Sequence, residues 1–219
     1  LNKLDDIIIF DVGSHTGNTV NRYRSVFPNS QIFAFEPTES SYKKLINQFD
    51  NDKKINVSLS GLSNKVDKMT FYLSESDNLN SFKEPNERAW GFEKEEITHV
   101  NTNTIDNFCD IHNIKHIDIL KLDVQGSELD ILKGSQLFLS ECKIGLIYLE
   151  WQVVPLYNGH SRYFKIGEYL ERYGYEFFNL YNINEATSGQ LRWGDSIYIN
   201  SNIRRDLITR FGRGQGSGW

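Results

Sequence analysis

The chain has 219 residues, of which 39% are hydrophobic and 24% are charged, and its formal net charge is −5 at pH 7. This composition can bury a core and excludes a wholly disordered chain. The negative balance gives no overall positive field, so we expect no nucleic-acid partner. The length suits one domain, since a domain contains roughly 150 residues.

The sequence also bears on location. It has no run near the roughly 18 apolar residues that span a bilayer, and no signal-peptide core precedes the first apolar strand. We therefore expect a cytoplasmic protein without a transmembrane segment. The two cysteines, Cys109 and Cys142, lack CxxC or Cys/His spacing and are expected to be reduced thiols.

Short apolar runs alternate with segments of helical spacing along most of the chain. Apolar runs of this length are typical of strands buried on both faces. The expected strands are residues 7–10, 31–35, 55–59, 69–73, 96–100, 117–122, 144–149, 175–180 and 196–200. The expected helices are residues 19–27, a helix from the N-cap Ser40 to Phe49, residues 105–112, one helix that carries Leu129, Leu132 and Leu137, and residues 164–173.

This order of elements predicts an α/β fold, a mostly parallel sheet with helices on both faces. Residues 69–73 and 96–100 are short, β-prone and partly polar, so we expect them to form an inserted β-hairpin. We expect one domain over residues 1–211, with a charged insertion at about 74–100. The Gly-rich residues 212–219 are expected to form a flexible tail.

The carboxyl ends of the parallel strands are where a sheet of this kind binds its ligand. Gly13 and Gly17 follow the first strand in a DxGxxxG pattern, which lets the backbone turn tightly and approach a ligand. Glu36 ends the second strand, where a carboxylate can accept hydrogen bonds from ribose hydroxyls. Together they indicate a cofactor that contains adenosine. The GxGxxG of a pyrophosphate loop is missing, so a shorter, cationic cofactor fits better than a dinucleotide.

Six segments, in one order along the chain, form a more specific pattern. They are FDVGSHTG at residues 10–17, FEP at 35–37, TID at 104–106, LKLDVQGSE at 120–128, LKG at 132–134 and YLE at 148–150. Together they resemble the FkbM family of class I S-adenosylmethionine-dependent methyltransferases. The family usually has Glu where Gln125 stands, and this chain has few residues before the first strand.

The resemblance implies a Rossmann-like, seven-stranded sheet of order 3-2-1-4-5-7-6 with the last strand antiparallel. It implies S-adenosyl-L-methionine as cofactor, S-adenosyl-L-homocysteine as product, and O-methylation of a sugar, glycolipid or secondary metabolite. It also implies the cofactor-binding residues, which are Asp11, Gly13, Ser14, His15, Thr16, Gly17, Glu36, Pro37, Ser60, Gly61, Leu62, Asp123 and Val124.

Removal of the acceptor's hydroxyl proton requires a base near the transferred methyl group. The candidates are Asp123, Glu150 and His160, with His15 as a further possibility. Glu150 could instead hold a helix N-terminus or Arg162, and His160 lies in a turn-like segment that could be a plain surface turn. No tight cluster of acids indicates a metal, so none is expected.

Two other functions stay open at this point. A non-catalytic, methyltransferase-like binding module is favoured only by Gln125, and an NAD(P)-dependent oxidoreductase would require a GxGxxG loop and a catalytic pair that we cannot place. The charged stretch 82–96 is either a solvated face or, because it contains Trp90 and Phe92, a substrate lid. The expected partner of the leading function is a small-molecule or glycan acceptor.

Overall fold

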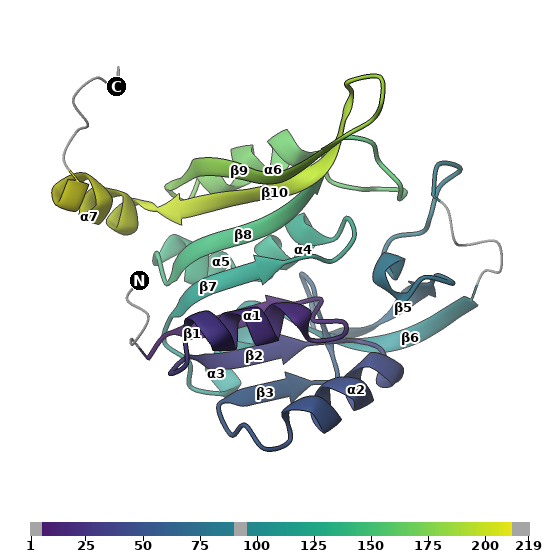
Figure 1. Cartoon of the computed structure of the whole chain (residues 1–219), viewed down its shortest axis with the longest axis horizontal. Coiled ribbons are helices and arrows are strands. Elements are labelled where there is room, and N and C mark those ends of the chain that lie inside the picture. Colours follow the sequence, from purple (N-terminus) through teal and green to yellow (C-terminus); the bar gives the residue numbers. More distant parts are fainter. Residues whose placement is uncertain (1–5, 90–95, 212–219) are drawn as a thin grey trace.

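The computed structural model describes residues 6–89 and 96–211. Its centre is a seven-stranded sheet in the order β3-β2-β1-β7-β8-β10-β9 (Figure 1). The first five of these strands pair in parallel, and β10 runs antiparallel to both of its neighbours. The mostly parallel sheet and the strand order implied by the resemblance are therefore confirmed. The strands are β1 (Ile8–Val12), β2 (Gln31–Phe35), β3 (Ile55–Ser58), β7 (Ile117–Leu122), β8 (Ile144–Gln152), β9 (Tyr175–Glu185) and β10 (Leu191–Asn200).

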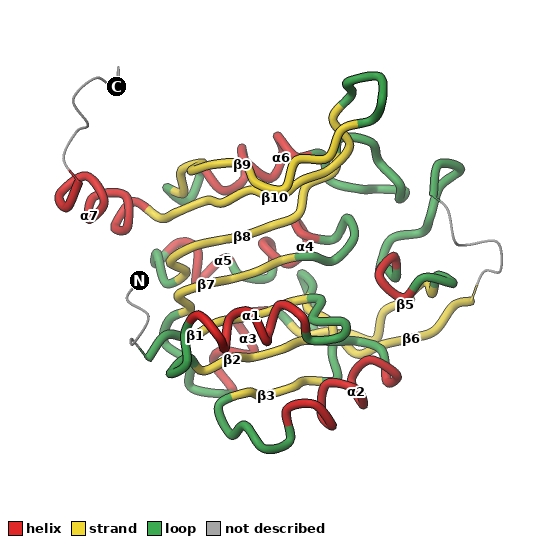
Figure 2. Tube along the Cα trace, in the orientation of Figure 1, coloured by secondary structure: helices red, strands yellow, loops and turns green. Residues whose placement is uncertain are grey.

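Helices cover both faces of the sheet, as expected (Figures 1 and 2). Helices α1 and α2 lie on one face, where Val20, Leu45 and Phe49 pack against apolar side chains of β1 and β2. Helices α3 to α6 lie on the other face, over the larger part of the core. These helices are α1 (Asn18–Val26), α2 (Glu39–Phe49), α3 (Ile105–Ile111), α4 (Glu128–Lys133), α5 (Gln136–Ser140) and α6 (Tyr163–Glu171).

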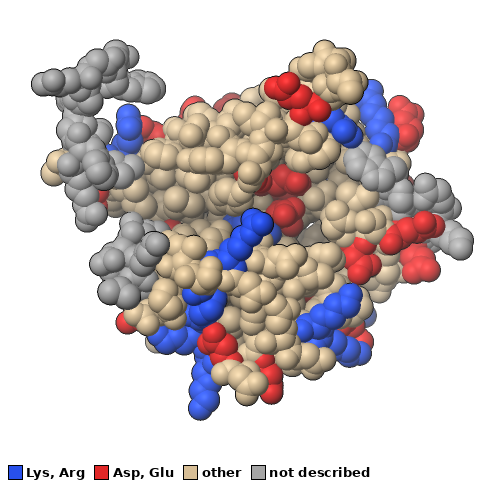
Figure 3. Space-filling model, in the orientation of Figure 1, with Lys and Arg blue, Asp and Glu red and all other residues tan. Residues whose placement is uncertain are grey.

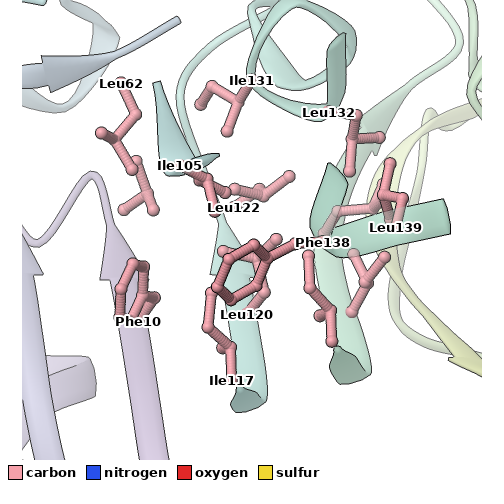
Figure 4. Packing of buried hydrophobic residues seen from close by; sticks show 14 of the residues in the cluster. Phe10, Leu62, Ile105, Ile117, Leu120, Leu122, Ile131, Leu132, Phe138 and Leu139 are labelled. Carbon is pink, nitrogen blue, oxygen red and sulfur yellow. The ribbon is translucent and has the colours of Figure 1, made fainter. Parts of the chain in front are cut away.

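The larger core fixes β1 relative to β7. Phe10 of β1 is fully buried, and its ring centroid lies 5.2 Å from that of Phe35 and 5.7 Å from that of Phe108. Figure 4 shows Leu120 and Leu122 of β7 in the same layer of side chains. Burial of one such side chain stabilises the fold by about 1.5–3 kcal/mol. The loops that follow β1 and β7 are therefore held side by side.

The expected hairpin is confirmed, and it is part of a second, three-stranded sheet. Strands β5 (Asp67–Leu73) and β6 (Glu96–Asn103) pair antiparallel, and the short β4 (Gly61–Leu62), which we did not predict, adds to β6 in parallel. This sheet stands beyond the carboxyl ends of β1 and β2 (Figure 1), and the 3₁₀ turn η1 (Asp77–Leu79) follows β5. Trp90, Phe92 and the expected tail at residues 212–219 lie outside the described residues.

The start of α2 differs from the prediction. The helix begins at Glu39 with Thr38 in the N-cap position, so Ser40 as the N-cap is wrong. The reason is in the preceding strand end, because the carboxylate of Glu36 accepts hydrogen bonds from the backbone N–H of Thr38 at 3.0 Å and from its hydroxyl at 2.6 Å. These bonds start the helix two residues earlier than predicted.

The expected single helix with Leu129 and Leu137 is also wrong, because the chain breaks into α4 and α5 at Gly134. A Cβ at Gly134 would lie 2.1 Å from the backbone oxygen of Ser63, so a neighbouring loop packs directly against this point. The carboxylate of Asp106 then accepts the backbone N–H of Leu137 at 2.9 Å. A distant side chain thus starts the second helix.

The last strands are longer than predicted, and a helix that we did not predict follows them. β9 continues to Glu185 and β10 begins at Leu191, with register shifts near Trp193. Helix α7 (Ser201–Phe211) starts where the side-chain oxygen of Asn200 accepts the backbone N–H of Ile203 at 2.9 Å. No helix in the described ranges is both long and apolar enough to cross a membrane.

Candidate active site

The loop after β1 forms the centre of the site. Gly13 and Gly17 have φ values of +81° and +80°, a region that L side chains rarely adopt. A Cβ at Gly13 would lie 2.0 Å from the backbone oxygen of Asp123, so only glycine allows the β1 and β7 loops to approach this closely. At Gly17 a Cβ would lie 2.9 Å from the Leu45 side chain, so this glycine serves the packing of α2.

Glu36 is held in a fixed position at the end of β2. Its Oε2 accepts the backbone N–H of His15 at 3.0 Å, and its Oε1 accepts both hydrogen bonds from Thr38. The carboxylate is only 6% exposed. It therefore ties the glycine loop to the β2 end while it forms part of the wall of a small hollow.

A buried lysine, which the sequence did not single out as a site residue, joins the ends of β1 and β7. The Nζ of Lys121 lies 3.2 Å from Asp11 Oδ1 and 3.5 Å from Asp123 Oδ2, and it donates to the backbone oxygen of Gly13 at 3.1 Å. Burial opposes the charge of Lys121, but the attraction of Asp11 and Asp123 outweighs it and raises the pKa of the lysine. Burial also raises the pKa of Asp11. Asp11 is 0% exposed, and it contacts the Lys121 ammonium group that in turn donates to the backbone oxygen of Gly13.

Gln125 lies at the centre of the polar contacts behind Asp123. Its Nε2 donates to Glu150 Oε2 at 3.0 Å and to Asp123 Oδ1 at 3.3 Å. Its Oε1 accepts hydrogen bonds from Gln152 Nε2 at 3.2 Å and from the Tyr157 hydroxyl at 3.3 Å. A neutral amide therefore bridges two carboxylates that would otherwise repel each other.

Glu150 is partly buried, and its surroundings perturb its ionisation. Burial, and after it the charges of Asp123 and Glu128, raise the pKa of Glu150 to about 8. Glu128, which had no predicted role, is buried. Its carboxylate accepts hydrogen bonds from the backbone N–H groups of Val124 and Gly126, which lower its pKa, but burial has the larger effect and raises the pKa to about 7. Carboxyl groups with pKa values near neutrality are typical of catalytic sites.

His160 lies behind this network. Its Nε2 is 3.4 Å from the backbone oxygen of Gln152, and its Nδ1 is 2.8 Å from the point where a Cβ of Gly126 would be. Burial lowers the pKa of the imidazole. The structure thus places His160 against Gly126, outside the lining of both hollows described below, and its catalytic role stays a prediction.

Two adjacent hollows lie at the carboxyl ends of the strands. The first, of about 130 Å³, is lined by most of the residues that the sequence indicated for the cofactor, namely Gly13, His15, Glu36, Pro37, Gly61, Leu62, Asp123 and Val124. Its other wall comes from the insertion, through side chains such as Phe71 and Phe82, which the sequence pattern did not assign to a site. Asp11, Ser14, Thr16, Gly17 and Ser60 do not line this hollow, and their contacts with the cofactor stay predictions.

The second hollow, of about 510 Å³, shares Asn78 and Gln125 with the first. Glu150, Gln152 and Trp193 are part of its wall. A third hollow, of about 550 Å³, lies between the start of α2 and the hairpin, and none of the candidate bases lines it. The first two hollows therefore meet at Gln125, where the candidate bases Asp123 and Glu150 are also found.

The sheet order, the glycine loop after β1 and the carboxylate after β2 define a class I S-adenosylmethionine-dependent methyltransferase. A family model described as "Methyltransferase FkbM domain" matches residues 11–177. The chain therefore belongs to the FkbM methyltransferase family, and its cofactor is S-adenosylmethionine.

Comparisons with individual proteins agree with this class. The 2-O-methyltransferase NoeI of Sinorhizobium fredii is 26% identical over 168 residues, which are 70% of this chain and 67% of that protein. Methyltransferase 1 of Beauveria bassiana is 26% identical over 146 residues, and the match covers 59% of each chain. The chain thus spans about three fifths to two thirds of the length of these curated relatives.

Solved structures show the same fold. Fibrillarin of Methanococcus jannaschii, a pre-rRNA processing protein, gives a TM-score of 0.52 at 12% identity, covering 91% of this chain and 68% of that one. Fibrillarin of Aeropyrum pernix, solved with natively bound S-adenosyl-L-methionine, gives 0.51 at 12% identity and covers 91% and 69%. At such low identity these likenesses concern the fold alone.

Proposed function

We propose that the protein is an O-methyltransferase that transfers the methyl group of S-adenosylmethionine to a hydroxyl of a sugar, a glycolipid or a secondary metabolite. The observation that carries the proposal is Glu150, a partly buried carboxylate at the place where the two hollows meet. The name of the Sinorhizobium relative, a 2-O-methyltransferase, supports the choice of oxygen as the acceptor atom.

The residues of the first hollow fit the cofactor. Glu36 offers a fixed carboxylate for the ribose hydroxyls, and Gly13, which brings the β1 and β7 loops together, lines the same hollow. Leu62, Phe71 and Phe82 supply an apolar wall that suits the adenine ring. Asp123 supplies a negative charge next to this hollow, which suits a cationic ligand.

The chemistry then divides between the cofactor and the chain. The bound cofactor supplies an electrophilic methyl group on a sulfonium that is already a good leaving group, so positioning of the acceptor provides most of the acceleration. As the C–O bond forms and the S–C bond breaks, the hydroxyl loses a proton. We assign that proton to the carboxylate of Glu150, with Asp123 as the alternative acceptor.

Gln125 positions the proposed base. Its amide donates to Oε2 of Glu150, and Gln152 donates to the same oxygen at 3.3 Å. Both amides are buried, so they restrict the rotation of the carboxylate, and its other oxygen has no hydrogen-bond partner among the described residues. That oxygen is the one we propose to take the proton.

Release of S-adenosylhomocysteine from labelled S-adenosylmethionine, measured with a panel of sugars and glycolipids, tests the proposal. We expect turnover with at least one hydroxyl acceptor and a loss of at least about 100-fold in Glu150→Gln, since one general base contributes about 10²–10⁴-fold. Glu168→Gln is the matched control, because Glu168 is an exposed residue of α6 that pairs with Arg172.

The same experiment separates the alternatives. Saturable binding of S-adenosylmethionine without turnover on any acceptor favours a non-catalytic binding module, and binding of NAD alone overturns the assignment. RNA belongs in the panel, because the expectation of no nucleic-acid partner rests on the net charge of −5. On the face shown in Figure 3, blue basic and red acidic side chains are interspersed, which supports that expectation.

A further inference from the structure

The charges around the second hollow differ from those of the chain as a whole. The chain carries an excess of acidic residues, whereas the charged side chains in the described lining of this hollow are two arginines, Arg88 and Arg192, and one acid, Glu150. The polar residues between them, Gln125 and Gln152, are neutral amides. The described lining of the hollow therefore carries two positive charges and one carboxyl group.

A β-bulge turns Arg192 toward this hollow. Consecutive residues of a regular strand point to opposite faces of a sheet, yet Arg192 and Trp193 both line the hollow, and the guanidinium lies 4.5 Å from the Trp193 ring centroid. The register of β10 against β9 shifts between Leu191 and Trp193 and again between Trp193 and Asp195. Bulges of this kind re-aim side chains and are frequent beside active sites.

Arg88, in the segment between β5 and β6, lines the same hollow, and hydrogen bonds of the nearby Asn86 hold this segment. Asn86 donates its backbone N–H to the oxygen of Leu156 at 2.9 Å and its side-chain amide to the oxygen of Pro155 at 3.1 Å. The side-chain oxygen of Asn86 accepts the backbone N–H of Arg88 at 2.9 Å. The backbone that carries Arg88 is thus attached to the segment after β8, whose Leu156 also lines the hollow.

Neither arginine has a carboxylate partner within residues 6–89 and 96–211. Arg24, Arg172 and Arg204 each form an ion pair in the same part of the chain, but the ion pairs found there do not include Arg88 or Arg192. A guanidinium presents a planar set of donors that matches the oxygens of a carboxylate, phosphate or sulfate group. Two guanidinium groups that line one hollow and have no carboxylate partner among the described residues suit an anionic ligand.

We propose that the acceptor is an anionic hydroxyl compound, a sugar derivative that carries a carboxylate, phosphate or sulfate group. The anionic group binds between Arg88 and Arg192 at the rim, and the hydroxyl to be methylated faces Glu150. This inference rests on the proposed O-methyl transfer and adds the charge of the substrate to it. Trp193 supplies the apolar surface against which the sugar ring packs.

Matched acceptors test the inference. Glucuronate, glucose 6-phosphate and glucose 6-sulfate are compared with glucose, both for release of S-adenosylhomocysteine and for calorimetric binding to the protein loaded with S-adenosylhomocysteine. We expect at least one anionic sugar to exceed glucose by about 10- to 100-fold in kcat/KM, the range that corresponds to one charge-assisted hydrogen bond. The three anions distinguish a carboxylate from a phosphate or a sulfate.

Two variants make the test specific. Arg192→Gln and Arg88→Gln are expected to raise the KM for the anionic sugar about 10-fold or more, with a smaller change in kcat, because the arginines bind the acceptor and do not touch the reacting atoms. Arg172→Gln, which removes an exposed arginine directly after α6, is the control and is expected to retain the preference for the anion. Circular dichroism and thermal unfolding confirm that each variant is folded.

The outcomes separate this inference from the proposed function. Equal turnover of glucose and the anionic sugars, or a preference that survives both arginine variants, overturns the inference and leaves O-methylation standing. Saturable, Arg192-dependent binding of an anionic sugar without methyl transfer supports the inference and contradicts the reaction. Neither binding nor turnover of any of the three anionic sugars overturns the inference, whereas the proposed function is judged on the full panel of acceptors.

Discussion

The buried lysine beneath the glycine loop allows a quantitative prediction. Lys121→Met removes the only charged partner that Asp11 has among the described residues, in a position where Asp11 is 0% exposed. The substitution also removes the donor that joins Gly13 to Asp123. Methionine keeps the length and apolar stem of lysine, so the change is one of charge and hydrogen bonding.

The expected loss of stability follows from the buried Asp11 carboxylate, which the substitution leaves without its partner. Removal of one member of a buried ion pair costs about 3–5 kcal/mol, because the other charge stays buried without compensation. For a chain of this size 1 kcal/mol corresponds to about 2–4 °C in Tm. We therefore expect Lys121→Met to lower Tm by roughly 6–20 °C. The double variant Asp11→Asn with Lys121→Met has no buried charge left there and is expected to recover most of this loss.

Urea and thermal unfolding measure the four members of this double-mutant cycle. Lys43→Met is the control, because Lys43 forms a surface ion pair with Glu39 in which both side chains are about 70% exposed, and such pairs contribute only about 0–1 kcal/mol. A loss below about 1 kcal/mol for Lys121→Met, or a double variant as unstable as the single one, would refute the reasoning.

Three further predictions concern the site itself. Glu36→Ala should weaken S-adenosylmethionine binding about 10- to 100-fold in a calorimetric titration, whereas Glu39→Ala, at an exposed position of α2, should not; equal affinities would contradict the ribose-binding role. Turnover should rise with pH through about 8 as Glu150 loses its proton, and an unchanged kcat profile in Glu150→Gln would exclude it as the base. Because the pKa of Glu150 is raised above its ordinary value of 4.5, the folded state binds the extra proton, so its contribution to stability falls as the pH rises from about 4.5 to about 8. Gly13→Ala should lower Tm more than Gly159→Ala, since both glycines have positive φ but only a Cβ at Gly13 meets a backbone oxygen, at 2.0 Å; thermal unfolding that gives equal losses would show that backbone strain alone accounts for the cost.

Local patterns predicted the parts of the fold that depend on neighbours in sequence. The apolar runs of β1, β2, β7 and β8 are confirmed to within a residue or a few at each end, because a strand buried on both faces must be apolar throughout. The glycines after β1 and the carboxylate of Glu36 were also identified from their places in the chain, directly after predicted strands. A tight turn with positive φ favours glycine, and binding of ribose hydroxyls favours a carboxylate at the end of the second strand.

The errors lie where a distant segment decides the local conformation. The break between α4 and α5 depends on the backbone of Ser63 and the carboxylate of Asp106, which are far from it in sequence. The first turn of α2 is the exception, because Glu36, directly after β2, is only two residues from the Thr38 that it fixes. Helical spacing alone contains no information about such contacts, since it reports only which residues share a face.

The sequence by itself determined the family and the order of the sheet, and it indicated most of the residues that line the first hollow. Only the tertiary structure decided that Lys121 lies between two aspartates, that Gln125 bridges Asp123 to Glu150, and that Arg88 and Arg192 face one hollow. The physical reason is that these are interactions between side chains on different elements. Their energies depend on burial and on distances of a few ångströms, and packing fixes both quantities only after the sheet, its helices and the inserted hairpin have come together.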